Sequence, residues 1–215
     1  MLPFTVAEFF AVFAAYNAAI WPAQAVALLL GAGTVALALR GGGAAARLVP
    51  AALAAMWIWT GLGYHLLHFA AINPAARLFG AAFLLQGGLL LLAAVRRGGL
   101  PFGPPRGWRG VFGLALVAYA ALVYPLLGRL AGHEWSDLPA FGVTPCPVTI
   151  FTFGILLLAE APVPRWLLAV PLLWAVIGGS AAVLLAVPQD WLLLVGGLAA
   201  GAVMLRQRRG HPGAA

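Results

Sequence analysis

Long apolar runs are the feature of this sequence that most restricts its fold. Seven stretches are apolar over most of their length: residues 22–39, 48–69, 74–95, 108–127, 145–160, 165–187 and 191–205. At ~1.5 Å per helical residue, about twenty residues cross the ~30 Å hydrocarbon layer of a bilayer. The sequence therefore predicts an all-α polytopic membrane helix bundle with about seven transmembrane helices, of which the fifth is short.

Composition agrees with a bilayer environment. Hydrophobic residues make up 64% of the 215 residues and charged residues only 8%, which is too little charge to cover a soluble domain. Seven spans leave no room for a second domain. We therefore expect one integral-membrane domain over residues 1–210, surrounded by lipid, and a disordered tail at 211–215.

Residues 1–20 differ from the other apolar stretches because Glu8 and Asn17 interrupt them. Phe9, Phe13 and Tyr16 recur at helical spacing along one side. This pattern indicates a helix that lies in the membrane interface or inserts partly, rather than one that crosses. An eighth span is the alternative.

Arginine sets the expected orientation. The net charge is +7, and the twelve basic residues are all arginine. Counting spans assigns only Arg77 and Arg129 to one membrane face, and assigns the following ten to the other: Arg40, Arg47, Arg96, Arg97, Arg106, Arg109, Arg165, Arg206, Arg208 and Arg209. Cytoplasmic loops are rich in Lys and Arg, so the arginine-rich face and the C-terminus are predicted to be cytoplasmic. Arginines that determine topology do not indicate nucleic-acid binding.

Most reactive side chains fall on the opposite, outer face. Four of the five acids and three of the four histidines lie there, together with the single cysteine; the group is Glu8, His65, His68, His133, Glu134, Asp137, Cys146 and Asp190. An ionisable group near membrane depth indicates function by default. The outer face is therefore the predicted location of a site.

Cys146 is the leading candidate. Thr144 is suited to cap a helix and Pro145 to occupy its first position, which leaves the thiol in the first turn. The positive end of the helix dipole favours a thiolate there, and a thiolate is a nucleophile or a soft-metal ligand. The alternative is a small buried thiol beside a Pro-rich turn.

The histidines and acids supply the other candidates. His65 and His68 are three residues apart, so they share a helix face and could reach one metal or one carboxylate. His133 and Asp137 lie in an outer loop over residues 128–145, and Glu8 needs a partner or water. Asp190, by contrast, is explained as the N-cap of the last span.

Cysteine, histidine and carboxylate together are suited to Zn²⁺ or Cu. We take Cys146, His65 and His133 as the primary contacts and as the candidate metal ligands, with Glu8, His68 and Asp137 in support. No Cys-x-x-Cys, His-Glu-x-x-His or His-x-x-x-His spacing is present. The metal site therefore depends on folding to bring the loop and the helices together.

These observations favour a permease-like protein that handles a small solute or metal ion at a periplasm-facing site. An integral-membrane enzyme with a thiolate or a metal-bound water is one alternative. The other is an accessory subunit of a membrane complex, or a homo-oligomer. Small-residue faces such as Gly197-x-x-x-Gly201 permit close helix contact, either within the bundle or between chains.

Several short motifs also resemble those of a known family. They are Trp57-x-Trp59, Tyr64-His65, Ile72-Asn-Pro-Ala75, Gln86-Gly87, Gly132-His133, Pro145-Cys-Pro147 with Thr149-Ile-Phe-Thr-Phe-Gly154, and Ile177-Gly-Gly-Ser180. Together they resemble an uncharacterised family of bacterial multi-pass inner-membrane proteins, a domain of unknown function, from Phe4 to about Asp190. The resemblance implies a bacterial inner membrane and transfers no catalytic role. A likeness to seven-span zinc hydrolases of the alkaline ceramidase type fails, because residues 191–205 contain no histidine.

Overall fold

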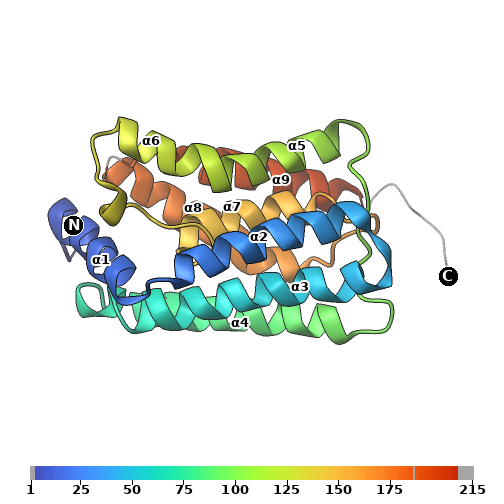
Figure 1. Cartoon of the computed structure of the whole chain (residues 1–215), viewed down its shortest axis with the longest axis horizontal. Coiled ribbons are helices and arrows are strands. Elements are labelled where there is room, and N and C mark those ends of the chain that lie inside the picture. Colours follow the sequence, from blue (N-terminus) through green and yellow to red (C-terminus); the bar gives the residue numbers. More distant parts are fainter. Residues whose placement is uncertain (1–2, 186, 208–215) are drawn as a thin grey trace.

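The computed structural model describes residues 3–185 and 187–207, and in these residues the fold is all-α (Figure 1). The α-helices are α1 (Val6–Ala19), α2 (Ala23–Arg40), α3 (Gly42–Trp59), α4 (Ala76–Val95), α5 (Gly107–Ala118), α6 (Tyr124–Leu130), α7 (Pro145–Leu156), α8 (Trp166–Leu184) and α9 (Trp191–Gln207). Two π-helical segments, η1 (Thr60–Leu66) and η3 (Tyr119–Val123), extend α3 and join α5 to α6. Short 3₁₀ segments are η2 (Phe69–Ala71), η4 (Trp135–Asp137) and η5 (Pro188–Asp190).

Six helical segments among the described residues are long and apolar enough to cross a membrane: Ala23–Arg40, Gly42–Ala71, Ala76–Val95, Gly107–Leu130, Trp166–Leu184 and Pro188–Gln207. They run roughly side by side along the long axis of the bundle (Figure 1). The predicted helix-bundle class is therefore confirmed. The tail predicted at 211–215 lies outside the described residues.

The N-terminal helix α1 does not join this set. Its 14 residues cover ~21 Å, too little to cross, and it lies across one end of the bundle (Figure 1). Two polar side chains attach it to the loop before α7. The Tyr16 hydroxyl donates to the Val143 carbonyl at 2.8 Å, and the Asn17 amide donates to the Ser136 and Leu138 carbonyls. A helix outside the set of spans was the prediction from Glu8 and Asn17.

The predicted fifth span is the central element of the fold, but it is shorter than expected. Helix α7 has 12 residues, or ~18 Å, and each of them except Cys146 is buried. It therefore does not cross a bilayer alone, which leaves six spans of full length rather than seven. Irregular segments before and after α7 make up the remaining depth, with Phe141 to Thr144 on one side and Leu157 to Ala159 on the other also buried.

The free backbone groups at the end of α7 have partners within the bundle. The Arg109 guanidinium on α5 donates to the Ala159 carbonyl at 2.7 Å and approaches the Leu156 carbonyl at 3.5 Å. In a bilayer, unpaired backbone groups have no water to bind, so such partners are needed wherever buried backbone is not helical. Polar side chains also join the helices: Trp57 Nε1 donates to Thr152 Oγ1 at 2.9 Å, and Gln86 Nε2 donates to the Leu167 carbonyl at 3.0 Å.

Helices α5 and α7 approach closely where two glycines face each other. A Cβ added to Gly154 would lie 2.8 Å from the Gly113 carbonyl oxygen, and one added to Gly113 would lie 2.8 Å from the Gly154 carbonyl oxygen. The obstacle in each case is backbone, which cannot turn aside as a flexible side chain can.

We therefore predict that Gly154→Ala lowers the free energy of unfolding by about 1–3 kcal/mol, the usual cost of overpacking. Thermal unfolding in detergent measures it. The matched control is Gly88→Ala on α4, where an added Cβ meets nothing within 4 Å. Equal melting temperatures for the two variants would contradict the close α5–α7 contact.

Candidate functional site

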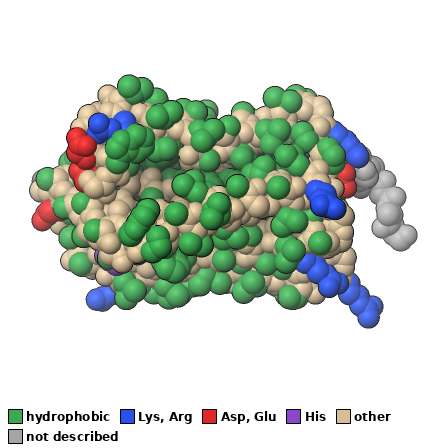
Figure 2. Space-filling view, viewed as in Figure 1, with side chains coloured by type: hydrophobic (Ala, Val, Ile, Leu, Met, Phe, Trp, Pro, Cys, Tyr) green, Lys and Arg blue, Asp and Glu red, His purple; other side chains and the backbone are tan. Residues whose placement is uncertain are grey.

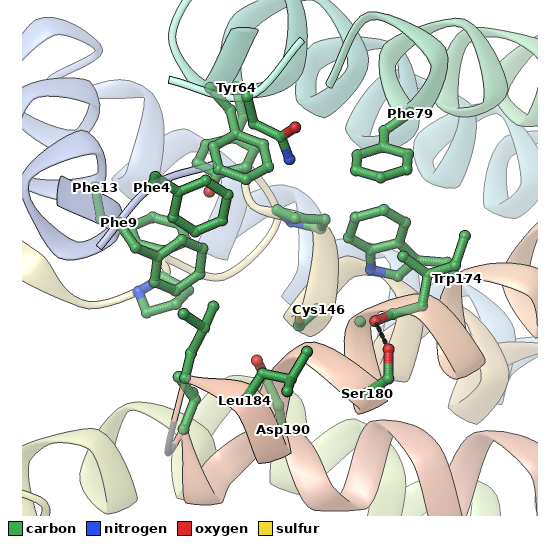
Figure 3. Close-up of a pocket in the computed structure, with 18 residues that line it drawn as sticks. Phe4, Phe9, Phe13, Tyr64, Phe79, Cys146, Trp174, Ser180, Leu184 and Asp190 are labelled. Carbon is green, nitrogen blue, oxygen red and sulfur yellow. Dashed lines mark hydrogen bonds between the residues drawn. The ribbon is translucent and has the colours of Figure 1, made fainter. Parts of the chain in front are cut away.

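A cavity of about 180 Å³ opens between α1, η1, α7 and α8 at the end of the bundle that α1 covers (Figure 3). Its described lining residues are Phe4, Phe9, Phe13, Tyr64, Phe69, Asn73, Phe79, Pro139, Pro145, Cys146, Trp174, Ile177, Gly178, Ser180, Leu184, Leu185, Val187 and Asp190. The lining is thus largely apolar, with a few polar groups. This is the usual composition of a small-molecule site.

One wall of the cavity is a set of packed aromatic rings. Phe9 packs edge-on against Phe13 at 5.1 Å between ring centroids, Phe13 stacks on Tyr64 at 4.9 Å, and Tyr64 stacks on Phe69 at 5.5 Å. Phe4 closes the set against Phe69 at 5.4 Å. Figure 3 shows Phe4, Phe9, Phe13 and Tyr64 together on one side of the cavity. We call these five rings the aromatic wall.

The opposite side carries the polar groups. The Tyr124 hydroxyl donates to Asp190 Oδ1 at 2.5 Å, and the Cys146 side chain lines the same cavity as Asp190. Trp174 also lines the cavity, and its indole N–H makes no hydrogen bond among the described residues. Cys146, Asp190 and Trp174 come from α7, η5 and α8, so three distant parts of the chain form this polar side.

Local backbone features place these side chains. Tyr64 lies in the π-helical segment η1, and Tyr124 directly follows the π-helical segment η3. A π-helical turn changes the direction of the side chains that follow it and occurs often at functional sites. Pro145 occupies the first turn of α7 as predicted, which sets Cys146 at the cavity. The Thr144 hydroxyl, however, donates to the Ala140 carbonyl and does not cap α7.

The family match agrees with the sequence motifs. A model of a family of unknown function, DUF6064, matches residues 6–213. The chain belongs to this family. Neither a curated protein sequence nor a solved structure matches the chain. The resemblance to an uncharacterised family is thus confirmed, and in this DUF6064 chain the chemistry must be argued from the site itself.

Asp190 is the residue that sequence reasoning missed. It was assigned to capping α9, but its carboxyl group bonds to the Tyr124 side chain and lines the cavity instead. The side chain is 5% exposed. An unusual acid inside an apolar segment was the available signal, and the adjacent Trp191 made a cap the simpler interpretation.

His65 is close to the cavity without lining it. It is fully buried among aromatic rings, with the Phe83 ring at 4.7 Å and the Trp174 ring at 5.1 Å between centroids. Neither ring nitrogen has a hydrogen-bond partner among the described residues. Trp174 therefore packs against His65 and also lines the cavity together with Cys146, the two residues that were expected to share a site.

His133 lies elsewhere. It stacks on Phe10 at 3.9 Å between ring centroids and is not among the residues that line the cavity. Its carbonyl accepts from Arg129, and Arg129 also pairs with Glu134 at 3.2 Å. Among the described residues no three His, Cys, Asp or Glu side chains cluster in a way that could hold a metal ion. The structure thus does not bring Cys146, His65 and His133 together.

The remaining candidates lie at the surface. Glu8 and His68 both line a shallow groove between α1 and the end of the second span. Glu8 bonds to Thr5 in a capping box at the start of α1, and these hydrogen bonds hold the pKa of Glu8 below its ordinary value. His68 Nδ1 lies 2.7 Å from the Gly63 carbonyl oxygen, and Asp137 accepts from Ser136. None of the three reaches the cavity lining.

The surroundings of His65 give a direct prediction. We expect His65→Leu to leave the melting temperature unchanged or to raise it, because it removes buried polar atoms that have no partners and keeps an apolar side chain of similar size. Thermal unfolding in detergent provides the measurement. His68→Leu, which loses the bond to Gly63, should be slightly destabilising, by about 1 kcal/mol. A large loss of stability in His65→Leu alone would show that the imidazole has an essential partner.

Proposed function

We infer that this chain is a bacterial inner-membrane protein that binds a small solute from the periplasmic side and handles it in a permease-like manner. The observation that carries this inference is the cavity with the aromatic wall on one side and Cys146, Asp190 and Trp174 on the other. It lies at one end of the bundle, where α1 covers it, so a solute could enter from that side.

The arginine distribution supports the orientation. Among the described residues, Arg77 and Arg129 lie at the end of the bundle that holds the cavity. The other eight lie at the opposite end: Arg40, Arg47, Arg96, Arg97, Arg106, Arg109, Arg165 and Arg206. Figure 2 shows several of these basic side chains at the end near the C-terminus, with an apolar belt between the two ends. The positive-inside bias then puts the cavity on the periplasmic side.

The short length and position of helix α7 support a transport role, rather than a role in packing alone. Secondary transporters place solute sites at broken helices whose N-terminal ends point into the site. Here α7 is of half length, is surrounded by the other helices, and presents Pro145 and Cys146 at the cavity. The irregular backbone before it is permitted at depth because the bundle buries it.

The cavity favours this reading over the enzyme and metal alternatives. Cys146 and Asp190 line the same cavity, and none of the described lining residues is basic. A nearby cation stabilises a thiolate nucleophile, whereas an acid in the same cavity disfavours the thiolate form. Cys146 and Asp190 are the two best metal ligands in the lining, which is fewer than the four that a Zn²⁺ or Cu site usually holds. An organic solute therefore fits better.

The glycine faces give no particular support to an accessory subunit. A Cβ added to Gly197 would contact Phe153 and Ala175, and one added to Gly201 would contact Leu172. The glycine face of α9 thus packs closely against α7 and α8 of the same chain. A homo-oligomer would have to use other surfaces.

Because Cys146 is the single cysteine of the chain, thiol labelling tests this proposal. We predict that a small, membrane-impermeant methanethiosulfonate reagent labels Cys146 in spheroplasts, from the periplasmic side. Ile177→Trp, which fills the cavity, should slow the labelling about tenfold or more. The control is a Cys146→Ser, Ala202→Cys double variant, which carries its thiol at the opposite end and should react only in inverted vesicles.

Labelling of Cys146 from the cytosolic side alone would refute the orientation. Transport is then tested in proteoliposomes, by counterflow of a solute that protects Cys146 from the reagent. A solute that protects the thiol but never exchanges across the membrane would make this a binding protein and not a permease.

A further inference from the structure

Resting on the proposed function, we propose that the solute is a small hydrophobic ammonium cation. Its charged nitrogen would pair with the Asp190 carboxylate, and its apolar body would lie against the aromatic wall. Three observations lead to this ligand class: the charge of the cavity, the character of its walls, and its size.

The first observation is the charge of the cavity. Asp190 is buried, and its side-chain hydrogen-bond partner, the Tyr124 hydroxyl, is a neutral group. None of the described residues that line the cavity is basic. Arg129, in the last turn of α6, is paired with Glu134. A carboxylate buried in this way needs a cation beside it, and a bound ligand can supply one. An anionic ligand would instead meet an acid and no positive charge.

The walls come second. The aromatic wall contributes five rings, and Phe79 and Trp174, packed edge-on at 5.3 Å, add two more across the cavity from Phe4, Phe9 and Phe13 (Figure 3). The faces of aromatic rings carry negative potential and attract cations, most strongly where water is excluded. A cavity lined by aromatic rings and by one acid attracts organic cations, whereas a metal ion would prefer several oxygen, nitrogen or sulfur ligands.

The size comes third. An apolar cavity of about 150 Å³ accommodates benzene, whereas pockets for drug-sized ligands measure ~300–1,000 Å³. The present cavity, at about 180 Å³, therefore fits a single ring or a short alkyl group with an amine attached. Larger multi-ring cations would require the part of the aromatic wall that α1 supplies, Phe9 and Phe13, to move.

Three isosteric probes test the inference: 2-phenylethylamine as the cation, 2-phenylethanol as the neutral analogue and phenylacetate as the anion. The readout is protection of Cys146 in the full-length purified protein from the methanethiosulfonate reagent. We expect the amine to protect at roughly tenfold lower concentration than the alcohol, and phenylacetate not to protect. Asp190→Asn keeps the acceptor for Tyr124 and should remove the preference for the amine. Asp137→Asn, in the exposed loop, should keep it.

A second variant tests the inference in case Asp190→Asn does not fold. Tyr124→Phe retains the carboxylate and removes one of its donors, so the preference for the amine should persist or increase. If the amine and the alcohol protect equally, the cation inference fails and the solute-binding proposal stands. If the amine gives no protection although Cys146 is labelled from the periplasm, the inference also fails. If Cys146 is not reached from that side, the proposed function itself fails.

Discussion

The structure depends on one constraint, which is that backbone groups away from water must be paired within the protein. Full-length helices meet it by themselves, and six segments do so here. Helix α7 does not, because it stops after 12 residues. Its short length is tolerated because the other helices surround it and because the backbone groups at both of its ends have partners. Arg109 donates to carbonyls at its C-terminal end, and the Tyr16 hydroxyl donates to the Val143 carbonyl just before its start.

The same arrangement creates the cavity. Because α7 begins partway into the bundle, the space at its N-terminal end is not filled by helix, and Pro145 and Cys146 face it. Helix α1 then covers the opening with Phe9 and Phe13, and its attachment to the loop before α7 couples the two elements. A movement of α1 would therefore open the cavity and disturb the backbone that leads into α7.

The polar side of the cavity shows how a low dielectric raises the importance of single groups. Tyr124 donates a hydrogen bond to Asp190, Cys146 lines the same cavity, and all three lie among apolar side chains. Near the surface such contacts would contribute little, because water competes for each group. In an apolar site a buried acid is costly unless it is fully paired, which is why the proposed ligand class rests on Asp190. His65 illustrates the contrast: its ring is also buried, but it faces aromatic rings and reaches neither Asp190 nor the cavity lining.

The sequence alone determined the fold class, the approximate spans, the N-terminal helix that does not cross, and the first-turn position of Cys146. Hydropathy and helical period act along the chain, so local patterns are enough to predict these features.

The site was only partly predictable. Cys146 was found, but Asp190 was taken for a cap, and His133 was grouped with Cys146 although it stacks on Phe10. The length of α7 and the meeting of η1, α7, α8 and η5 were decided by tertiary packing. Which side chains face a shared cavity depends on how helices distant in sequence are rotated against one another. The π-helical turns at Tyr64 and before Tyr124 change that rotation, and the hydropathy of the sequence does not reveal such turns.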